Sequence, residues 1–118
     1  MRTIPFAVAL ALVLGGVMSA FATGEAPPKD AKTNYASLCK GCHGESGKGD
    51  TKLGQMLKAP DFSAAKVQEA LKDERIFKAI KEGLKKGDKV IMKPYADKLT
   101  DPEIKALVEL LRSFKPKP

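Results

Sequence analysis

Apolar residues recur every three or four positions in several stretches of the chain, which is the spacing of one face of an α-helix. The clearest stretch lies near the C-terminus and carries its stripe on Ile104, Leu107, Val108 and Leu111. Thr100 and Glu103 have the three-residue spacing of a capping box, so a helix is expected to begin directly after Thr100. Phe114 extends the stripe, and Pro116 follows where the helix should end.

Four shorter segments carry the same helical pattern less clearly. We expect a helix that Asp30 caps and that runs into residues 39–43, one over 51–57, one over 63–71, and one that Asp73 caps and that ends at Gly83. The last of these places Ile76, Phe77 and Ile80 on one face. From Gly83 to Leu99 the pattern predicts a loop of about seventeen residues, long enough to be functional. No alternating strand pattern is visible, so the chain is predicted to be an all-α domain.

Residues 39–43 read Cys-Lys-Gly-Cys-His, which is the attachment motif of a c-type haem. Helix positions three apart share a face, so Cys39 and Cys42 can bond to two vinyl groups on one porphyrin edge. His43 can then ligate the iron from one side. The motif uses both cysteines and the one histidine of the chain. In the loop that follows, residues 44–50, the glycines would let the backbone turn closely around the porphyrin edge.

Three other interpretations of these cysteines fit the sequence less well. A thioredoxin-like dithiol needs a preceding strand and helix, and the pattern shows no strand there. A structural zinc site normally needs four ligands, and only three adjacent Cys or His residues exist. A structural disulfide is compatible with secretion, but it does not require the adjacent histidine. We therefore favour one covalently bound haem c as the cofactor.

The N-terminal stretch has the features of a secretory signal peptide. Arg2 supplies the positive charge, residues 4–17 are apolar, and Ala20-Phe21-Ala22 is a small-x-small cleavage site. We expect residues 1–22 to be removed after about Ala22, residues 23–29 to form a flexible leader, and residues 30–118 to form the domain. The alternative is an uncleaved membrane anchor, which the apolar length nearly allows. Cleavage implies a periplasmic protein with no stable membrane insertion.

A sixth iron ligand must come from a residue other than histidine, because the chain has only one. Of four methionines, Met1 and Met18 lie in the expected signal peptide. Met56 closely follows the cysteine motif and is interpreted as packing or surface. Met92 lies in the long predicted loop, which could cross the opposite haem face, and it is favoured as the ligand over Met56, a lysine or an open site.

These segments resemble the small bacterial class I c-type cytochromes with one haem. The resemblance rests on residues 39–44, 59–62, 92–99 and 100–104 and covers nearly all of the domain. It implies a cytochrome c-like fold of three to five helices around the haem, with His43 and Met92 as axial ligands. It also implies that Pro60 presents its carbonyl to the His43 ring.

The chain departs from the family pattern in two places. Lys93 separates Met92 from Pro94, where many members have proline directly after the methionine. The chain also lacks tryptophan, which some members place beside a haem propionate. Three residues were considered as replacements, and the sequence does not choose among them: Tyr95, Lys98 and Arg112.

The function expected is that of a periplasmic one-electron carrier rather than an enzyme. The alternative is a haem enzyme or gas sensor with an open or labile sixth site, such as a peroxidase, although no distal histidine is available for acid–base work. The 118 residues carry a net charge of +7, which favours acidic redox partners and discourages self-association, so a monomer is expected. Nucleic acid is disfavoured for an exported protein. A lysine cluster could steer acidic partners or be an ordinary solvated loop, and it comprises Lys81, Lys85, Lys86, Lys89 and Lys93.

Overall fold

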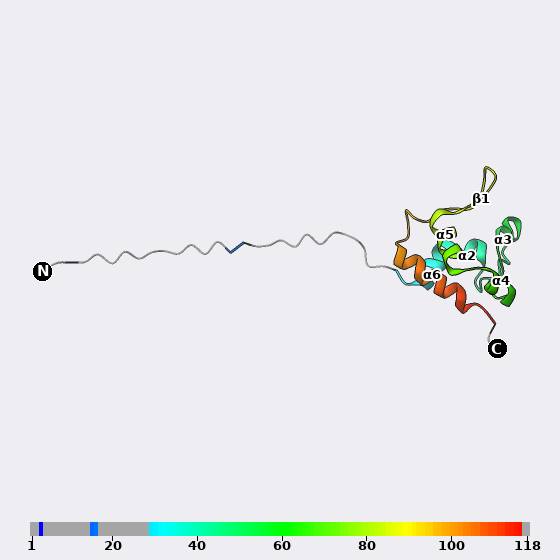
Figure 1. Ribbon diagram of the computed structural model, residues 1–118, viewed down its shortest axis with the longest axis horizontal. Coiled ribbons are helices and arrows are strands. Elements are labelled where there is room, and N and C mark those ends of the chain that lie inside the picture. The colour runs from blue at the N-terminus through cyan, green and yellow to red at the C-terminus, as the bar shows by residue number, and fades with distance from the viewer. Residues whose placement is uncertain (1–2, 4–14, 17–28, 117–118) are drawn as a thin grey trace.

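The structure is a computed structural model that describes residue 3, residues 15–16 and residues 29–116. The expected signal peptide, and all of the leader except Lys29, therefore lie almost wholly outside the described residues. Residues 29–116 form a mostly helical domain with one small hairpin (Figure 1). The elements in chain order are α1 (Ala31–Asn34), η1 (Tyr35–Cys39), α2 (Lys40–His43), α3 (Lys52–Leu57), α4 (Ala65–Ala70), α5 (Asp73–Glu82), β1 (Leu84–Lys86), β2 (Lys89–Met92) and α6 (Asp101–Ser113).

The first helical segment is continuous through α1, η1 and α2, as the sequence predicted. Asp30 caps it, because its carboxylate accepts a hydrogen bond of 2.9 Å from the backbone N–H of Thr33. The middle turn, η1, is a π-helical turn, in which the N–H of Lys40 reaches back to the carbonyl of Tyr35. Such wide single turns occur often at functional sites. This one lies directly before the Cys-x-x-Cys-His motif.

The C-terminal helix α6 is the centre of the core and matches the prediction closely. Thr100 and Glu103 form the complete capping box. Of the stripe residues, Ile104 and Leu107 are the most deeply buried side chains in the described chain. The helix packs against α1 on one side and α5 on another. Beyond its end, the Phe114 ring lies against the Tyr35 ring with centroids 5.3 Å apart, which joins the two ends of the domain.

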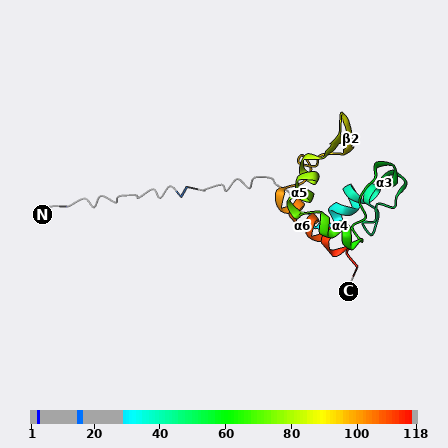
Figure 2. The same ribbon diagram turned by 45° about the vertical axis from the view of Figure 1, so that its right-hand side comes forward.

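The segment after Gly83 differs from the sequence prediction. Instead of a plain loop, β1 and β2 form an antiparallel hairpin with Lys86 opposite Lys89, and the hairpin projects from the helices (Figure 2). The strands are three and four residues long, and β1 is exposed throughout, so no alternation of buried and exposed residues marks them. Backbone pairing specifies this hairpin, and side-chain periodicity could not reveal it.

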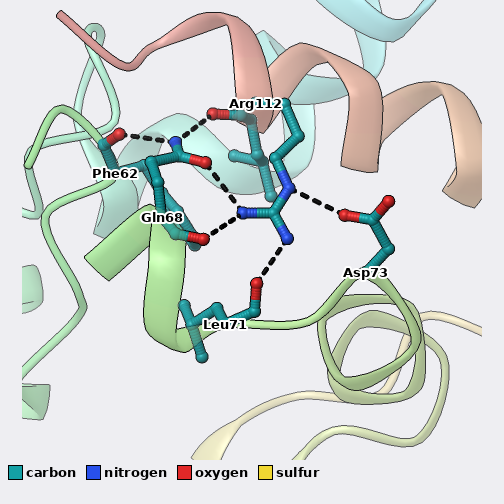
Figure 3. Close-up of polar contacts among 6 residues, drawn as sticks. Phe62, Gln68, Leu71, Asp73 and Arg112 are labelled. Carbon is teal, nitrogen blue, oxygen red and sulfur yellow. Dashed lines mark hydrogen bonds and ion pairs between the residues drawn. The ribbon is translucent and has the colours of Figure 1, made fainter. Parts of the chain in front are cut away.

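The start of α5 also differs in detail. Lys72 occupies the N-cap position without a side-chain hydrogen bond, so Asp73 is not the cap but the first helical residue. The Asp73 carboxylate accepts a hydrogen bond of 2.7 Å from the guanidinium of Arg112 in α6 (Figure 3). Ile76 and Ile80 are buried, as the pattern predicted, and Phe77 is half-buried. The predicted all-α fold class is confirmed for residues 29–116, and the hairpin is a small addition to it.

Candidate haem site

One apolar cavity of about 220 Å³ lies among the helices and the hairpin. Several separate parts of the chain build its wall, including the segment after α3, β1 and α6. The first helical segment contributes Tyr35, Cys39 and His43, and α5 contributes the stripe that includes Ile76 and Ile80. The end of β2 contributes Met92. The wall therefore brings together a thiol, an imidazole and a thioether that are far apart in the sequence, among mainly apolar neighbours.

His43 is held as a neutral ring in this cavity. Burial lowers its pKa, because the charged imidazolium would lose its hydration. Its Nδ1 atom is buried and has no hydrogen-bond partner among the described residues. The ring lies against Phe62, with centroids 5.7 Å apart. A neutral imidazole in an apolar cavity is the form that ligates a metal, so this residue fits a haem iron.

The two cysteines are free and half-buried. Cys39 lies in the cavity wall, while Cys42 is not part of it. Burial, with a smaller effect from the neighbouring Cys42, raises the pKa of Cys39 to about 11. A dithiol oxidoreductase needs a lowered thiol pKa, so this environment does not suit one. Attachment to a porphyrin remains the role that suits both thiols.

The two candidate methionines lie in different surroundings. Met92 lies in the cavity wall at the end of β2. Met56 lies on α3 with 70% of its surface exposed. Pro60 also lines the cavity, but no hydrogen bond joins it to His43 in the described chain. Its carbonyl role stays a prediction.

Side-chain hydroxyls anchor the backbone of the haem motif, which the sequence analysis did not foresee. Each donates a hydrogen bond to a carbonyl group within residues 38–44. The pairs are Tyr95 to Leu38 at 3.0 Å, Thr51 to Cys42 at 3.0 Å and Tyr35 to Gly44 at 2.5 Å. Burial raises the pKa of Tyr35 to about 12, so its hydroxyl keeps the proton that it donates. These bonds tie the backbone around the motif to η1, to the N-cap residue of α3 and to the segment after β2.

The glycine-rich loop after the motif packs against protein rather than leaving its inner face open. Gly47 has φ of 70°, and a Cβ there would lie 2.5 Å from the Phe114 ring. Gly49 has φ of 63°, and a Cβ there would lie 2.6 Å from the carbonyl of Ala59. The expectation that these glycines curve around a porphyrin edge therefore gains no support, because close protein contacts account for them.

A cluster of hydrogen bonds around Gln68 and Arg112 reaches the backbone of three residues of the cavity wall (Figure 3). The Gln68 amide donates to the carbonyls of Phe62 and Leu111, at 2.7 and 2.8 Å. The Arg112 guanidinium donates to the backbone and side-chain oxygens of Gln68 and to the carbonyl of Leu71. Three of these residues, Phe62, Leu71 and Leu111, line the cavity. The side chains of Gln68 and Arg112 therefore hold this part of the wall by bonding to its backbone carbonyl groups.

Comparisons with known proteins identify a family for this chain. The sequence profile of the family described as cytochrome C oxidase, cbb3-type, subunit III matches residues 26–111. The solved structure of the KustC0563 c-type cytochrome is 41% identical, has a TM-score of 0.67 and aligns over 75% of this chain and 100% of its own. A tyrosine-to-phenylalanine mutant of Kustc0563 is 40% identical, with a TM-score of 0.64, over 74% and 100% of the two chains. No curated protein matches the chain.

The cavity and the comparisons point to the same conclusion. The wall offers the residue types that hold a haem, and the likeness to the KustC0563 c-type cytochrome covers the whole length of that protein. The family profile spans the haem motif, the cavity and most of α6. The chain therefore belongs to the c-type cytochrome family that this profile describes, whose members are electron-carrying haem proteins.

Proposed function

We propose that this protein is a periplasmic one-electron carrier with a single haem c, attached through Cys39 and Cys42 and ligated by His43 and Met92. One observation carries the proposal: a single apolar cavity gathers Cys39, His43 and Met92. The haem supplies a ferric–ferrous couple when bound. The protein supplies two axial ligands and a water-poor surrounding.

The residues of the cavity suit electron transfer more than substrate chemistry. With His43 and Met92 both holding the iron, a substrate would find no free position on it. The thioether of Met92 would be a soft ligand, which would favour ferrous iron and raise the potential. The hydrogen bonds of Gln68 and Arg112 hold the wall rigid, so little has to move when the charge changes.

Axial ligation is tested by substituting Met92 with alanine and using Met56→Ala as the matched control. The wild-type ferric protein should show the far-red band of methionine-ligated haem, and Met92→Ala should lose it. Met56→Ala should keep the band, because this side chain is 70% exposed on α3. Rapid carbon monoxide binding by the untreated ferrous wild-type protein would instead favour an open-site enzyme or gas sensor.

Covalent attachment and export are tested on purified protein. The pigment should stay with the polypeptide in acidified organic solvent, and the mass should equal one haem plus a chain that begins at Thr23. Pigment release would contradict thioether bonds to Cys39 and Cys42. A chain that still carried residues 1–22 would contradict cleavage. Within residues 29–116, no helix is long and apolar enough to cross a membrane.

Docking to acidic redox partners is proposed for the exposed lysines of the hairpin and its exit. Four of the five lysines in the cluster are exposed, namely Lys85, Lys86, Lys89 and Lys93. Lys81 pairs with Asp101 at 3.0 Å and is less free to dock. Replacing Lys85, Lys86 and Lys89 with glutamine should slow reduction by an acidic partner at low salt and weaken the salt dependence. Equal slowing on replacing three exposed lysines elsewhere, Lys66, Lys105 and Lys115, would refute a specific role for the hairpin.

A further inference from the structure

Arg75 stands apart from the other residues of the cavity wall. The wall is apolar almost throughout, and Arg75 is its only lysine, arginine, aspartate or glutamate. Arg75 lies on the α5 face that also presents Ile76, Ala79 and Ile80 to the cavity. Its own side chain is exposed, so it lies where the apolar wall meets water. A ligand that fills this cavity would thus meet one positively charged side chain at the rim.

The guanidinium of Arg75 has no protein partner in the described part of the chain. Neighbouring cations on α5 are engaged: Lys78 pairs with Glu82 at 3.9 Å, and Lys81 pairs with Asp101 at 3.0 Å. No ion pair or side-chain hydrogen bond includes Arg75 within residues 29–116. Its planar donors therefore remain available to an anion that extends from the cavity.

We propose that Arg75 binds a propionate carboxylate of the haem, an inference that rests on the proposed function. A haem is a flat apolar body with two carboxylates on one edge. The α5 stripe can contact the flat body while the guanidinium donates two parallel hydrogen bonds to a carboxylate. This arrangement matches an apolar cavity with a single cation at its margin.

The three residues that the sequence suggested for this role are less suitable. The Tyr95 hydroxyl already donates to the carbonyl of Leu38. The Arg112 guanidinium is used by the polar cluster with Gln68 and by Asp73. Lys98 is exposed and does not line the cavity. Arg75 is the cation that both reaches the cavity and has donors to offer.

A cation at this place has a defined effect on the haem potential. Ferric haem carries one more positive charge than ferrous haem, so a nearby cation disfavours the ferric form and raises the potential. The same cation offsets the negative charge of the propionate. Removing it should therefore lower the potential, and added salt should shrink the difference because the site is partly exposed to water.

The test compares Arg75→Gln, Arg75→Lys and Lys78→Gln in the haem-loaded protein. Lys78→Gln removes one positive charge from the same helix at a position outside the cavity wall. Potentiometric titration at low salt should show a lower potential for Arg75→Gln, a smaller decrease for Arg75→Lys, and a value close to wild type for Lys78→Gln. All three variants should keep the far-red methionine band and the wild-type circular dichroism.

Equal potentials for Arg75→Gln and Lys78→Gln would overturn the assignment, since a general charge effect would then suffice. A structure of the loaded protein with the Arg75 guanidinium away from both propionates would also overturn it. These failures differ from failure of the carrier proposal, which would already be visible in the wild-type protein as a missing far-red band or a missing covalent pigment.

Discussion

Gly83→Ala tests how firmly the end of α5 positions the strand that carries Met92. Gly83 ends the helix with φ of 75° and ψ of −179°, a combination that almost only glycine adopts. A Cβ at this position would lie 2.6 Å from the carbonyl oxygen of Met92 and 2.8 Å from the nitrogen of Pro94. Both contacts are backbone atoms that cannot rotate away. The substitution must therefore displace the segment around Met92.

Two separate costs add up at Gly83. Backbone strain in this region costs about 1–3 kcal/mol. Forcing a methyl group into a filled space costs a further ~1–3 kcal/mol. Gly87, at the hairpin turn, is the matched control, because it also has positive φ, at 61°, but a Cβ there would meet nothing within 4 Å. Gly87→Ala should lower the free energy of unfolding only by the cost of the left-handed backbone conformation, about 1–2 kcal/mol.

The assay is chemical denaturation of both variants, followed by far-UV circular dichroism, together with the far-red band of the ferric protein. Gly83→Ala should lose about 2 kcal/mol more free energy of unfolding than Gly87→Ala, through the added contact cost. It should also weaken or shift the far-red band, while Gly87→Ala leaves the band unchanged. Equal losses of stability, or an intact band in Gly83→Ala, would refute the close packing of Gly83 against the Met92 strand.

Three further substitutions test the remaining contacts. The hydrogen bond from the Thr100 N–H is the main cause that lowers the pKa of Glu103 from 4.5 to about 2. The ionised carboxylate therefore stabilises the fold above pH 4.5, and this contribution is lost as the pH falls towards 2. In Glu103→Gln the free energy of unfolding should fall less steeply with pH between 4.5 and 2. An acid-unfolding profile identical to that of the wild type would contradict this role of Glu103. Tyr35→Phe removes one of two donors to the Gly44 carbonyl, which keeps the hydrogen bond of 3.3 Å from the Gly47 N–H, so it should lower the free energy of unfolding by about 0.5–1.5 kcal/mol. A neutral effect in chemical denaturation would contradict the bond. Arg112→Lys keeps the charge but not the fork of donors, so it should destabilise the protein nearly as much as Arg112→Ala, and full rescue by lysine would show that charge alone matters.

The sequence alone determined the features that depend on residues close together in the chain. The capping box of Thr100 and Glu103, the stripe of α6 and the helix that runs into the cysteine motif are local patterns, and the structure confirms each. The haem motif is equally local, because two thiols and an imidazole within five positions are enough to suggest the cofactor. The choice of Met92 over Met56 came from loop position and resemblance, and its ligation stays a prediction.

Tertiary structure decided the features in which distant residues meet. The hairpin carries no side-chain periodicity, since backbone hydrogen bonds between two short exposed strands define it. The hydroxyl of Tyr95 finds the Leu38 carbonyl across 57 positions, and no spacing rule links the two. Arg75 looks like any other exposed cation in the sequence, and only the packing of α5 beside Met92 and His43 places it at the rim of the cavity. Helical periodicity tells which face of a helix is apolar, but which partner that face meets depends on how the whole chain closes around its core.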